Sequence, residues 1–232
     1  MIKRALTAIR YYLRTAGHLK AFHYWPVLPL RLLIAMVGKR TVTAALKTGL
    51  TFRIRSPMDL WIVMEVVVAR DYERYVAVAQ GDMVIDIGAG IGDFTISVAS
   101  RANRVIAVEP DPGRLVLLRE NLLANDVKNV IVLPLAAKNL HDLLTSQGIS
   151  RCDFLKIDCE GCEYGLLNEG GLDAIDAVAA EVHRFVDHQN DEFEKLYSTL
   201  EESGFEVHYV PNPVHSETGL IYARRLGQAR RT

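Results

Sequence analysis

Cysteine is scarce in this sequence, which has three cysteines among 232 residues. Cys152, Cys159 and Cys162 fall within a stretch of eleven residues, and an odd, clustered count is a poor framework for disulfides. Such usage is typical of a reducing compartment. Cys159 and Cys162 have the C-x-x-C spacing of a metal site, but no second pair completes the set of about four ligands that a structural zinc ion needs. We therefore predict packed cysteines that flank a loop, and no metal site.

Acidic residues are absent from the first 58 positions, which contain eleven Lys and Arg. The remaining 174 residues carry 16 basic and 28 acidic side chains, so the overall net charge of −1 conceals two segments of opposite charge. The charged residues after Ala223 are again all basic: Arg224, Arg225, Arg230 and Arg231. Basic ends of this kind predict contact with an anionic partner, such as a lipid surface, a phosphorylated carrier or nucleic acid, or with the acidic part of the chain itself.

Long apolar runs are also absent. The stretch 27–38 is too short to span a bilayer and is interrupted by Arg31, which excludes a transmembrane helix there. Residues Ile2, Leu6, Ile9 and Leu13 recur at helical spacing and predict a short basic amphipathic helix. That helix either packs on the rest of the protein or makes a peripheral membrane contact through residues 1–40. We expect a cytoplasmic protein, with membrane-peripheral attachment as the alternative.

From residue 82 onward, strand and helix patterns alternate. This alternation predicts right-handed β-α-β units and a mostly parallel, doubly wound α/β sheet. The last two strands are joined by a loop alone and predict an antiparallel hairpin. The predicted strands are 83–87, 104–108, 130–135, 154–157, 177–181, 206–210 and 219–224, and the predicted helices are 94–100, 112–125, 140–146, 162–168 and 191–202.

The segment before the sheet predicts a strand over 50–55, where apolar and polar residues alternate. Pro57 and Asp59 then predict a helix start, with Asp59 as the cap and the helix ending near Gly81. We expect three parts in the chain: a basic helical N-terminal extension over 1–58, a cofactor-binding domain over 59–223 and a basic tail over 224–232.

The stretch VIDIGAGIGDFTI, residues 84–96, predicts a buried strand, a glycine turn and a helix start. A dinucleotide fingerprint requires its third glycine at position 93, which is Asp here. The carboxylate of Asp86 would repel a pyrophosphate but suits a ligand with an ammonium group. The motif resembles the D-x-G-x-G-x-G turn of S-adenosylmethionine methyltransferases, and an ordinary strand-to-helix turn is the alternative. The predicted cofactor contacts in this turn are Asp86, Gly88, Ala89, Gly90 and Gly92.

Further cofactor contacts are expected where the following strands end. Glu109 comes seventeen residues after Gly92, where a carboxylate can accept hydrogen bonds from both ribose hydroxyls, and Pro110 follows it. Ala137, after the third strand, is small enough to lie against an adenine ring. Asp158, at the end of the fourth strand, is expected beside the glycine turn.

Acidic residues gather at the ends of the fourth and fifth strands. Their burial without partners is costly, so we expect them to face an active-site cleft. A hydroxyl acceptor gains from a general base, for which we favour His183 or Asp158, with Glu160 and Glu181 orienting the substrate. The alternatives are a divalent ion held by the carboxylates, and a structural role for His183.

The run LKIDCEGCEYGLL closely resembles the D-x-E-G-x-E-x-x-x-L signature of FkbM-type methyltransferases. Four other segments of this chain agree in order: SPMDLWIVMEVVVARDYERY, VIDIGAGIGDFTI, VIAVEPDPGRLVLLRENL and EVH at the fifth strand. The resemblance covers about residues 50–223. It implies a seven-stranded class I methyltransferase fold, S-adenosylmethionine as cofactor and transfer of a methyl group to a hydroxyl of a sugar, glycolipid or other small molecule.

Two other functions stay open at this point. One is an RNA methyltransferase recruited by the basic termini, although no N/D-P-P-F/Y motif of amine methylation follows the fourth strand. For that reason we expect a small hydroxylated substrate, sugar or lipid-linked, rather than nucleic acid. The other is a membrane-peripheral binding protein that keeps the fold without catalysis. The sequence does not define the oligomeric state.

Overall fold

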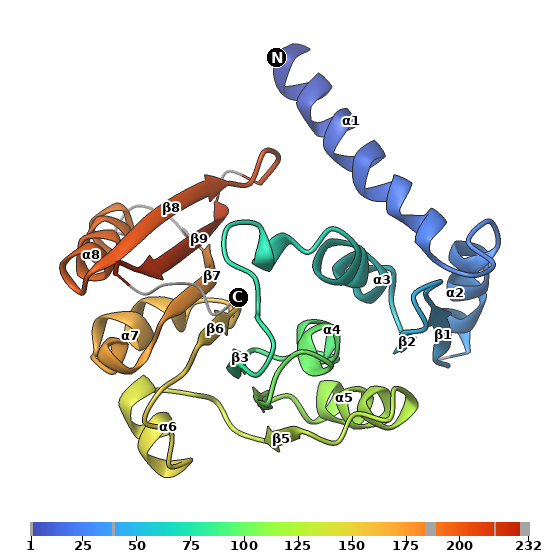
Figure 1. Cartoon of the computed structure of the whole chain (residues 1–232). Helices are drawn as coiled ribbons and strands as arrows, with labels where there is room; N and C mark the ends of the chain where they lie inside the picture. Colours follow the sequence, from blue (N-terminus) through green and yellow to red (C-terminus); the bar gives the residue numbers. More distant parts are fainter. Residues whose placement is uncertain (1, 39, 184–188, 216, 228–232) are drawn as a thin grey trace.

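A seven-stranded sheet forms the centre of the structure (Figure 1), which is a computed structural model and describes residues 2–38, 40–183, 189–215 and 217–227. The strand order is β5-β4-β3-β6-β7-β9-β8. The first five of these strands are parallel, and β9 pairs antiparallel with both β7 and β8. The strands are β3 (Met83–Ile87), β4 (Arg104–Val108), β5 (Val130–Leu133), β6 (Phe154–Ile157), β7 (Ala177–His183), β8 (Phe205–Pro211) and β9 (Thr218–Arg225).

These strands confirm the predicted fold class, including the antiparallel pair at the end of the chain. The bounds of β3, β4 and β6 are those predicted, because each is a short, mostly apolar run that is buried inside a parallel sheet. The other four differ from prediction only at their ends. Strand order reverses between β3 and β6, which places the carboxyl ends of these two strands at the expected ligand crevice.

Helices cover both faces of the sheet. On one face, Leu140 of α6, Leu166 of α7 and Leu196 of α8 join a cluster with Ile85 of β3. The opposite face is covered by α4 and α5, through residues such as Phe94 and Leu118. These helices are α4 (Asp93–Ala99), α5 (Pro112–Ala124), α6 (Leu140–Ser146), α7 (Glu163–Asn168), the 3-10 turn η4 (Leu172–Ala174) and α8 (Gln189–Glu202).

The N-terminal extension contains two helices and a hairpin that rests on α5. Asn121 Oδ1 accepts a hydrogen bond from Arg53 N at 2.6 Å, and Asn125 Oδ1 accepts one from Thr51 N at 2.9 Å, which fixes the hairpin to the core domain. The strand predicted over 50–55 is confirmed, but its partner β1 was not predicted. The elements are α1 (Ile2–Gly17), η1 (His18–Ala21), α2 (Leu28–Val37), β1 (Val42–Ala45) and β2 (Thr51–Ile54).

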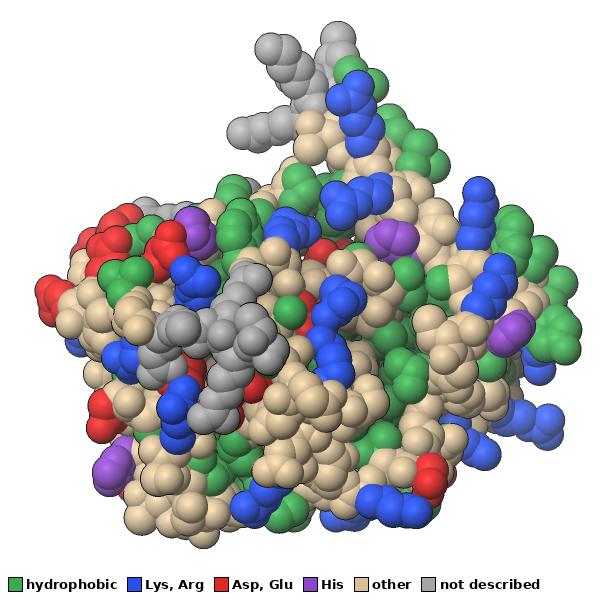
Figure 2. Space-filling view, in the orientation of Figure 1, with side chains coloured by type: hydrophobic (Ala, Val, Ile, Leu, Met, Phe, Trp, Pro, Cys, Tyr) green, Lys and Arg blue, Asp and Glu red, His purple; other side chains and the backbone are tan. Residues whose placement is uncertain are grey.

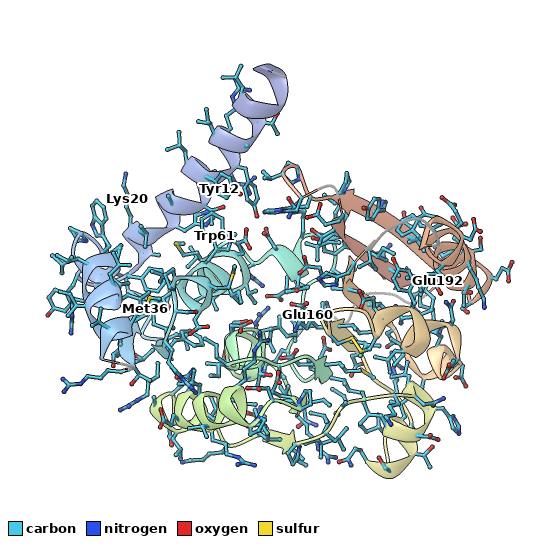
Figure 3. The ribbon with its side chains drawn as sticks, turned by 180° about the vertical axis from the view of Figure 1, so that it is seen from behind. Tyr12, Lys20, Met36, Trp61, Glu160 and Glu192 are labelled. Carbon is cyan, nitrogen blue, oxygen red and sulfur yellow. A yellow bond between two sulfur atoms is a disulfide. The ribbon has the colours of Figure 1, made fainter. Side chains whose placement is uncertain are left out.

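One face of α1 packs on the segment after the hairpin. Tyr12 lies 5.6 Å from Trp61 between ring centroids, and Tyr11 donates a hydrogen bond to Glu65 (Figure 3). The rest of α1 projects from the body of the protein (Figure 1). No helix among the described residues is both long and apolar enough to cross a membrane.

The predicted helix from Asp59 to near Gly81 is wrong in its start and its length. Ser56 is the N-cap, and Asp59 completes a capping box with it at the third helical position. The helical stretch ends at Ala69, and Arg70 adopts a left-handed φ of 56°. Burial of Tyr72 against the sheet outweighs helix propensity here. The segment consists of α3 (Pro57–Val63), the π-helical turn η2 (Met64–Val68) and the 3-10 turn η3 (Asp71–Glu73).

Two smaller predictions are also corrected. Cys159 and Cys162 form a disulfide, because the turn through Glu160 and Gly161, both at positive φ, brings their Cα atoms to 5.5 Å. The tail predicted from residue 224 starts inside β9, and the Arg225 guanidinium donates to the carbonyl oxygen of Ile175 at 2.9 Å. Residues 228–232, with the remaining basic positions of the tail, lie outside the described residues.

A buried ion pair joins the two central strands. Lys156 Nζ on β6 lies 3.0 Å from Asp86 Oδ1 on β3, and both side chains are almost completely buried. Thr95 Oγ1 donates to the other oxygen of Asp86 at 2.6 Å, and Lys156 Nζ also donates to Gly88 O at 2.7 Å. Burial alone would lower the pKa of Lys156. The negative charges of Asp86, Asp158 and Asp93 have the larger, opposite effect, so the pKa is raised overall and the ammonium group stays protonated.

Substitution of Lys156 by methionine is expected to destabilise the fold. The change leaves a buried Asp86 carboxylate without its counter-charge, at a cost of about 3–5 kcal/mol. Urea unfolding followed by circular dichroism measures the difference. The double variant Asp86→Leu/Lys156→Met should recover much of the loss because no charge is left buried. A single variant as stable as the wild type would show that the pair is not needed.

Candidate functional site

The predicted glycine turn lies directly against the end of β6. Gly88 has φ +75°, and a Cβ atom on it would lie 1.7 Å from the carbonyl oxygen of Asp158. Gly92, with φ +87°, is similarly constrained because a Cβ atom would lie 2.6 Å from Leu118 Cδ1. Both positions therefore require glycine, for close approach of the turn to the neighbouring strand and to α5. Their effect is to bring the start of α4 and the end of β6 together.

The predicted ribose-binding carboxylate, Glu109, ends β4 and is fixed in place. Its Oε2 accepts a hydrogen bond from Gly90 N at 2.8 Å, and its Oε1 accepts one from Asp111 N at 2.8 Å. The side chain is 3% exposed. A carboxylate oxygen has two lone pairs, so each can also accept a hydrogen bond from a ligand hydroxyl.

The residues of this crevice fit S-adenosylmethionine. The donor set combines an oriented carboxylate for the ribose with a turn in which a glycine is needed for close backbone approach. Lys156 already neutralises Asp86, so direct contact between Asp86 and the ammonium group of the ligand stays a prediction. The same holds for Ala89 and Ala137, which are buried, and for Pro110, which is exposed.

Three of the four predicted catalytic side chains come together at the carboxyl ends of β6 and β7. Asp158, Glu181 and His183 each present a ligating atom, and these atoms lie within 4.8 Å of one another. We call these residues the acid–histidine cluster. Glu160 is separate from it: its side chain is 73% exposed, and Oε1 lies 4.0 Å from an Arg114 nitrogen. The geometry suits either proton transfer or a divalent cation, so both alternatives stay open.

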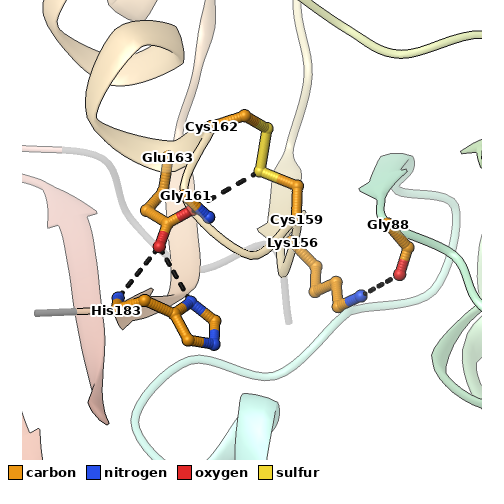
Figure 4. Close-up of a disulfide and its surroundings, with 7 residues drawn as sticks. All are labelled: Gly88, Lys156, Cys159, Gly161, Cys162, Glu163 and His183. Carbon is orange, nitrogen blue, oxygen red and sulfur yellow. Dashed lines mark hydrogen bonds and ion pairs between the residues drawn. A yellow bond between two sulfur atoms is a disulfide. The ribbon is translucent and has the colours of Figure 1, made fainter. Parts of the chain in front are cut away.

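Glu163 orients His183, a role that the sequence pattern did not predict. Its carboxylate is fully buried, and Oε1 lies 2.9 Å from both the Nδ1 and the backbone N of His183 (Figure 4). This hydrogen bond raises the pKa of His183 above its ordinary value, against the opposing effect of burial. Because Nδ1 donates its hydrogen to Glu163, Nε2 is the ring nitrogen suited to accept a proton or to bind a metal ion.

Burial raises the pKa of Glu181 to about 7, and the negative charge of Asp158 adds to the effect.

Tyr72, like Glu163, is a residue of the site that the sequence pattern does not predict. Its hydroxyl donates to Asp158 Oδ2 at 2.9 Å, and Lys156 Nζ lies 5.3 Å from the centre of its ring. No motif indicated this contact, because it depends on the break in the helix at Arg70.

A cavity of about 320 Å³ adjoins the acid–histidine cluster. Asp158 and Glu181 form part of its wall, and α1 contributes the opposite side. The turn between β8 and β9 closes a third side, in the region that Figure 1 shows next to α1. Its lining residues from these elements are Tyr11, Arg14, Thr15 and His18 on α1 and η1, and Val210, Pro211, Asn212, Pro213, Gly219 and Leu220 near the turn.

Two family models match parts of the chain. The TRM5/TYW2 methyltransferase domain matches residues 57–146, and the methyltransferase FkbM domain matches residues 124–207. Each match covers less than half of the chain. The FkbM match includes the cysteine-containing loop and the acid–histidine cluster, whereas the TRM5/TYW2 match includes the glycine turn and Glu109.

Curated relatives are RNA methyltransferases by name. The tRNA/tmRNA (uracil-C(5))-methyltransferase of Shewanella sp. (strain W3-18-1) is 25% identical over 158 residues, or 63% of this chain and 43% of that protein. The 23S rRNA (uracil(1939)-C(5))-methyltransferase RlmD of Salmonella typhimurium is 36% identical over 106 residues, covering 44% and 24%. The chain thus spans less than half the length of these relatives.

Solved structures share the fold. TYW2 of M. jannaschii, in complex with AdoMet, gives a TM-score of 0.50 at 18% identity and covers 80% of this chain and 87% of that one. SMU.1697c of Streptococcus mutans, in complex with SAH, gives a TM-score of 0.52 at 16% identity. The match covers 75% of this chain and 99% of that one. The chain therefore has the fold of class I methyltransferases, and both family models that match parts of it are methyltransferase domains.

Replacement of Glu109 by glutamine is expected to weaken binding of S-adenosylmethionine by about 10- to 100-fold. The reason is the loss of charge-assisted hydrogen bonds to the ribose, worth about 1.5–3 kcal/mol. Isothermal titration calorimetry measures the affinity, and Glu192→Gln on the exposed surface of α8 is the matched control. Equal affinity of Glu109→Gln and the wild type would exclude the ribose contact.

Proposed function

We propose that the chain transfers a methyl group from S-adenosylmethionine to a hydroxyl of a sugar, glycolipid or other small molecule, in the manner of the FkbM-type enzymes. The observation that carries this proposal is the acid–histidine cluster, which adjoins both the glycine turn and the cavity. Carboxylates and an oriented histidine suit an acceptor that must lose a proton as it reacts.

The residues of the chain have three tasks in this reaction. Bound S-adenosylmethionine supplies an activated methyl group on a positively charged sulfur. The cavity positions the acceptor oxygen in line with that methyl group and limits access of water. His183, oriented by Glu163, would accept the hydroxyl proton as the acceptor oxygen bonds to the methyl carbon. The bound cofactor would supply the leaving group, because its sulfur keeps the electron pair of the broken C–S bond. Asp158 and Glu181 hold the acceptor or the resulting imidazolium.

A panel of acceptors with labelled S-adenosylmethionine tests the proposal. The expected result is label transferred to a hydroxylated acceptor, and a rate about 10²- to 10⁴-fold lower for His183→Ala with unchanged cofactor affinity. Addition of EDTA separates the base from a metal ion, since only a bound cation would be removed. Absence of transfer to any hydroxyl, together with transfer to RNA, would contradict the proposal.

The acid–histidine cluster determines how kcat/KM depends on pH in the acidic to neutral range. Glu181 and His183 interact, so they titrate as a pair, and the base is active only after the pair loses its proton. We therefore expect kcat/KM to rise with pH through the neutral range. Glu181→Gln removes a negative charge that helps to raise the pKa of His183, so the rise should move to lower pH. A rise that stays in place or moves to higher pH would exclude this coupling.

RNA is the second candidate acceptor, and the comparisons with known proteins favour it over a small hydroxylated molecule. The printed names of the curated relatives are those of tRNA and rRNA methyltransferases, and the TRM5/TYW2 match covers the cofactor turn. Arg14 and Arg74 also line the cavity. The carboxylates Glu65, Asp71, Asp158 and Glu181 on the same wall oppose a polyanion.

Binding of tRNA and of rRNA fragments distinguishes the two acceptors. An RNA enzyme should bind with an affinity that falls steeply with added salt, and deletion of residues 1–49 should abolish that binding. Methyl transfer to RNA by the full chain, together with this salt-sensitive binding, would replace the proposal of a small hydroxylated acceptor.

A further inference from the structure

The helix α1 has two functional faces. One lines the cavity through Tyr11, Arg14 and Thr15. Leu6, Ile9 and Leu13 lie on the opposite face of the same helix, because they follow one another at helical spacing about half a turn away from the cavity residues. These three side chains are 49%, 53% and 67% exposed.

The apolar surface continues onto α2. Leu28 and Leu32 bury one side of this helix, while its other side faces outward with Val37 90% exposed. We define the apolar–basic face as the large hydrophobic side chains of α1, α2 and the turn between them that are at least 39% exposed. It contains twelve of the nineteen such side chains that are exposed in the described structure. They are Leu6, Ile9, Tyr12, Leu13, Tyr24, Trp25, Val27, Leu30, Leu33, Ile34, Met36 and Val37.

Exposed basic side chains lie on the same elements: Arg10 on α1, Lys20 on η1 and Arg31 on α2. The first 58 positions hold eleven Lys and Arg and no Asp or Glu. Figure 2 shows hydrophobic and basic side chains side by side over the N-terminal extension, in contrast to the red side chains at the left, where α8 lies. A patch that is both strongly apolar and strongly basic matches the interface of an anionic membrane, where acyl chains and phosphates lie within one layer.

Two other properties favour a bilayer over a second copy of the chain. A symmetric dimer through this face would bring the same basic side chains together. In addition, Tyr24 adopts a left-handed φ of 56°, and it is 74% exposed beside Trp25. Aromatic side chains of this kind are enriched at the headgroup level of membranes. The ten residues of α2 extend about 15 Å, half of a hydrocarbon core, so the helix would lie in the interface.

We propose that the apolar–basic face docks on an anionic membrane surface and that the acceptor is lipid-linked. The second part rests on the proposed function. With α1 lying on the membrane through one face, its other face forms the wall of the cavity at the level of the headgroups. A hydroxyl carried on a lipid would therefore reach the acid–histidine cluster without leaving the membrane surface, at a high local concentration.

Vesicle co-sedimentation tests the docking itself. The full chain is mixed with vesicles of phosphatidylcholine alone, or of equal parts of phosphatidylcholine and phosphatidylglycerol. We expect binding to the anionic vesicles that weakens with added salt, and a loss of about tenfold or more in the variant Leu30→Ser/Ile34→Ser. The control is Leu123→Ser, which removes a leucine that is 81% exposed on α5. Circular dichroism checks that all variants fold.

Three outcomes would overturn the docking: no binding to anionic vesicles, equal binding by the double variant, or a dimer in sedimentation velocity that the double variant abolishes. Salt-sensitive binding to RNA without binding to vesicles would also contradict it. None of these depends on methyl transfer, so failure of the docking is distinguishable from failure of the proposed function, which calorimetry with S-adenosylmethionine tests separately.

The acceptor is tested with a pair of substrates from the panel above. A soluble sugar that accepts methyl groups is compared with the same sugar on a diacylglycerol in anionic vesicles. The expected result is a kcat/KM about tenfold or more higher for the lipid-linked form, and loss of this advantage in Leu30→Ser/Ile34→Ser while the rate with the soluble sugar is kept. Equal kcat/KM for both forms would contradict a lipid-linked acceptor.

Discussion

The close approach of Gly88 to Asp158 is the constraint on which the rest of the site depends. A Cβ atom on Gly88 would lie 1.7 Å from the carbonyl oxygen of Asp158, so the cofactor turn and the reacting end of β6 adjoin only because this position is glycine. Lys156 connects the same two strands by pairing with Asp86 and donating to the carbonyl of Gly88. The glycine turn, which we predict to hold the cofactor, and Asp158, which we predict to face the acceptor, are thus held as one unit.

From this unit the site extends in two directions. Glu109 on β4 extends it toward the nucleoside part of the cofactor, where hydrogen bonds from Gly90 and Asp111 fix the carboxylate. The acid–histidine cluster extends it toward the cavity between α1 and the β8–β9 turn. The first part carries the features common to the fold. The second includes the less regular segments that line the cavity, and we propose that it selects the acceptor.

The central strands and the turn could be predicted because their signals are local. Buried, mostly apolar runs define β3, β4 and β6, and three glycines after an acid define the turn. The features that the sequence does not predict depend on tertiary contacts, which leave no local pattern. Tyr72 reaches Asp158 because a left-handed residue, Arg70, ends a stretch that has the composition of one long helix. The roles of Lys156 and Glu163 cannot be predicted from the sequence, because a charged residue inside a strand or helix does not indicate which residue it will pair with. The disulfide depends on the turn through Glu160 and Gly161.

We predict that the cofactor and acceptor sites meet at Asp158. A crystal structure of the chain with bound S-adenosylhomocysteine tests this arrangement. The expected structure has the ribose beside Glu109, the glycine turn around the amino-acid part and the sulfur directed at the cavity bounded by Asp158 and Glu181. A ligand bound elsewhere, or with its sulfur directed away from that cavity, would contradict it.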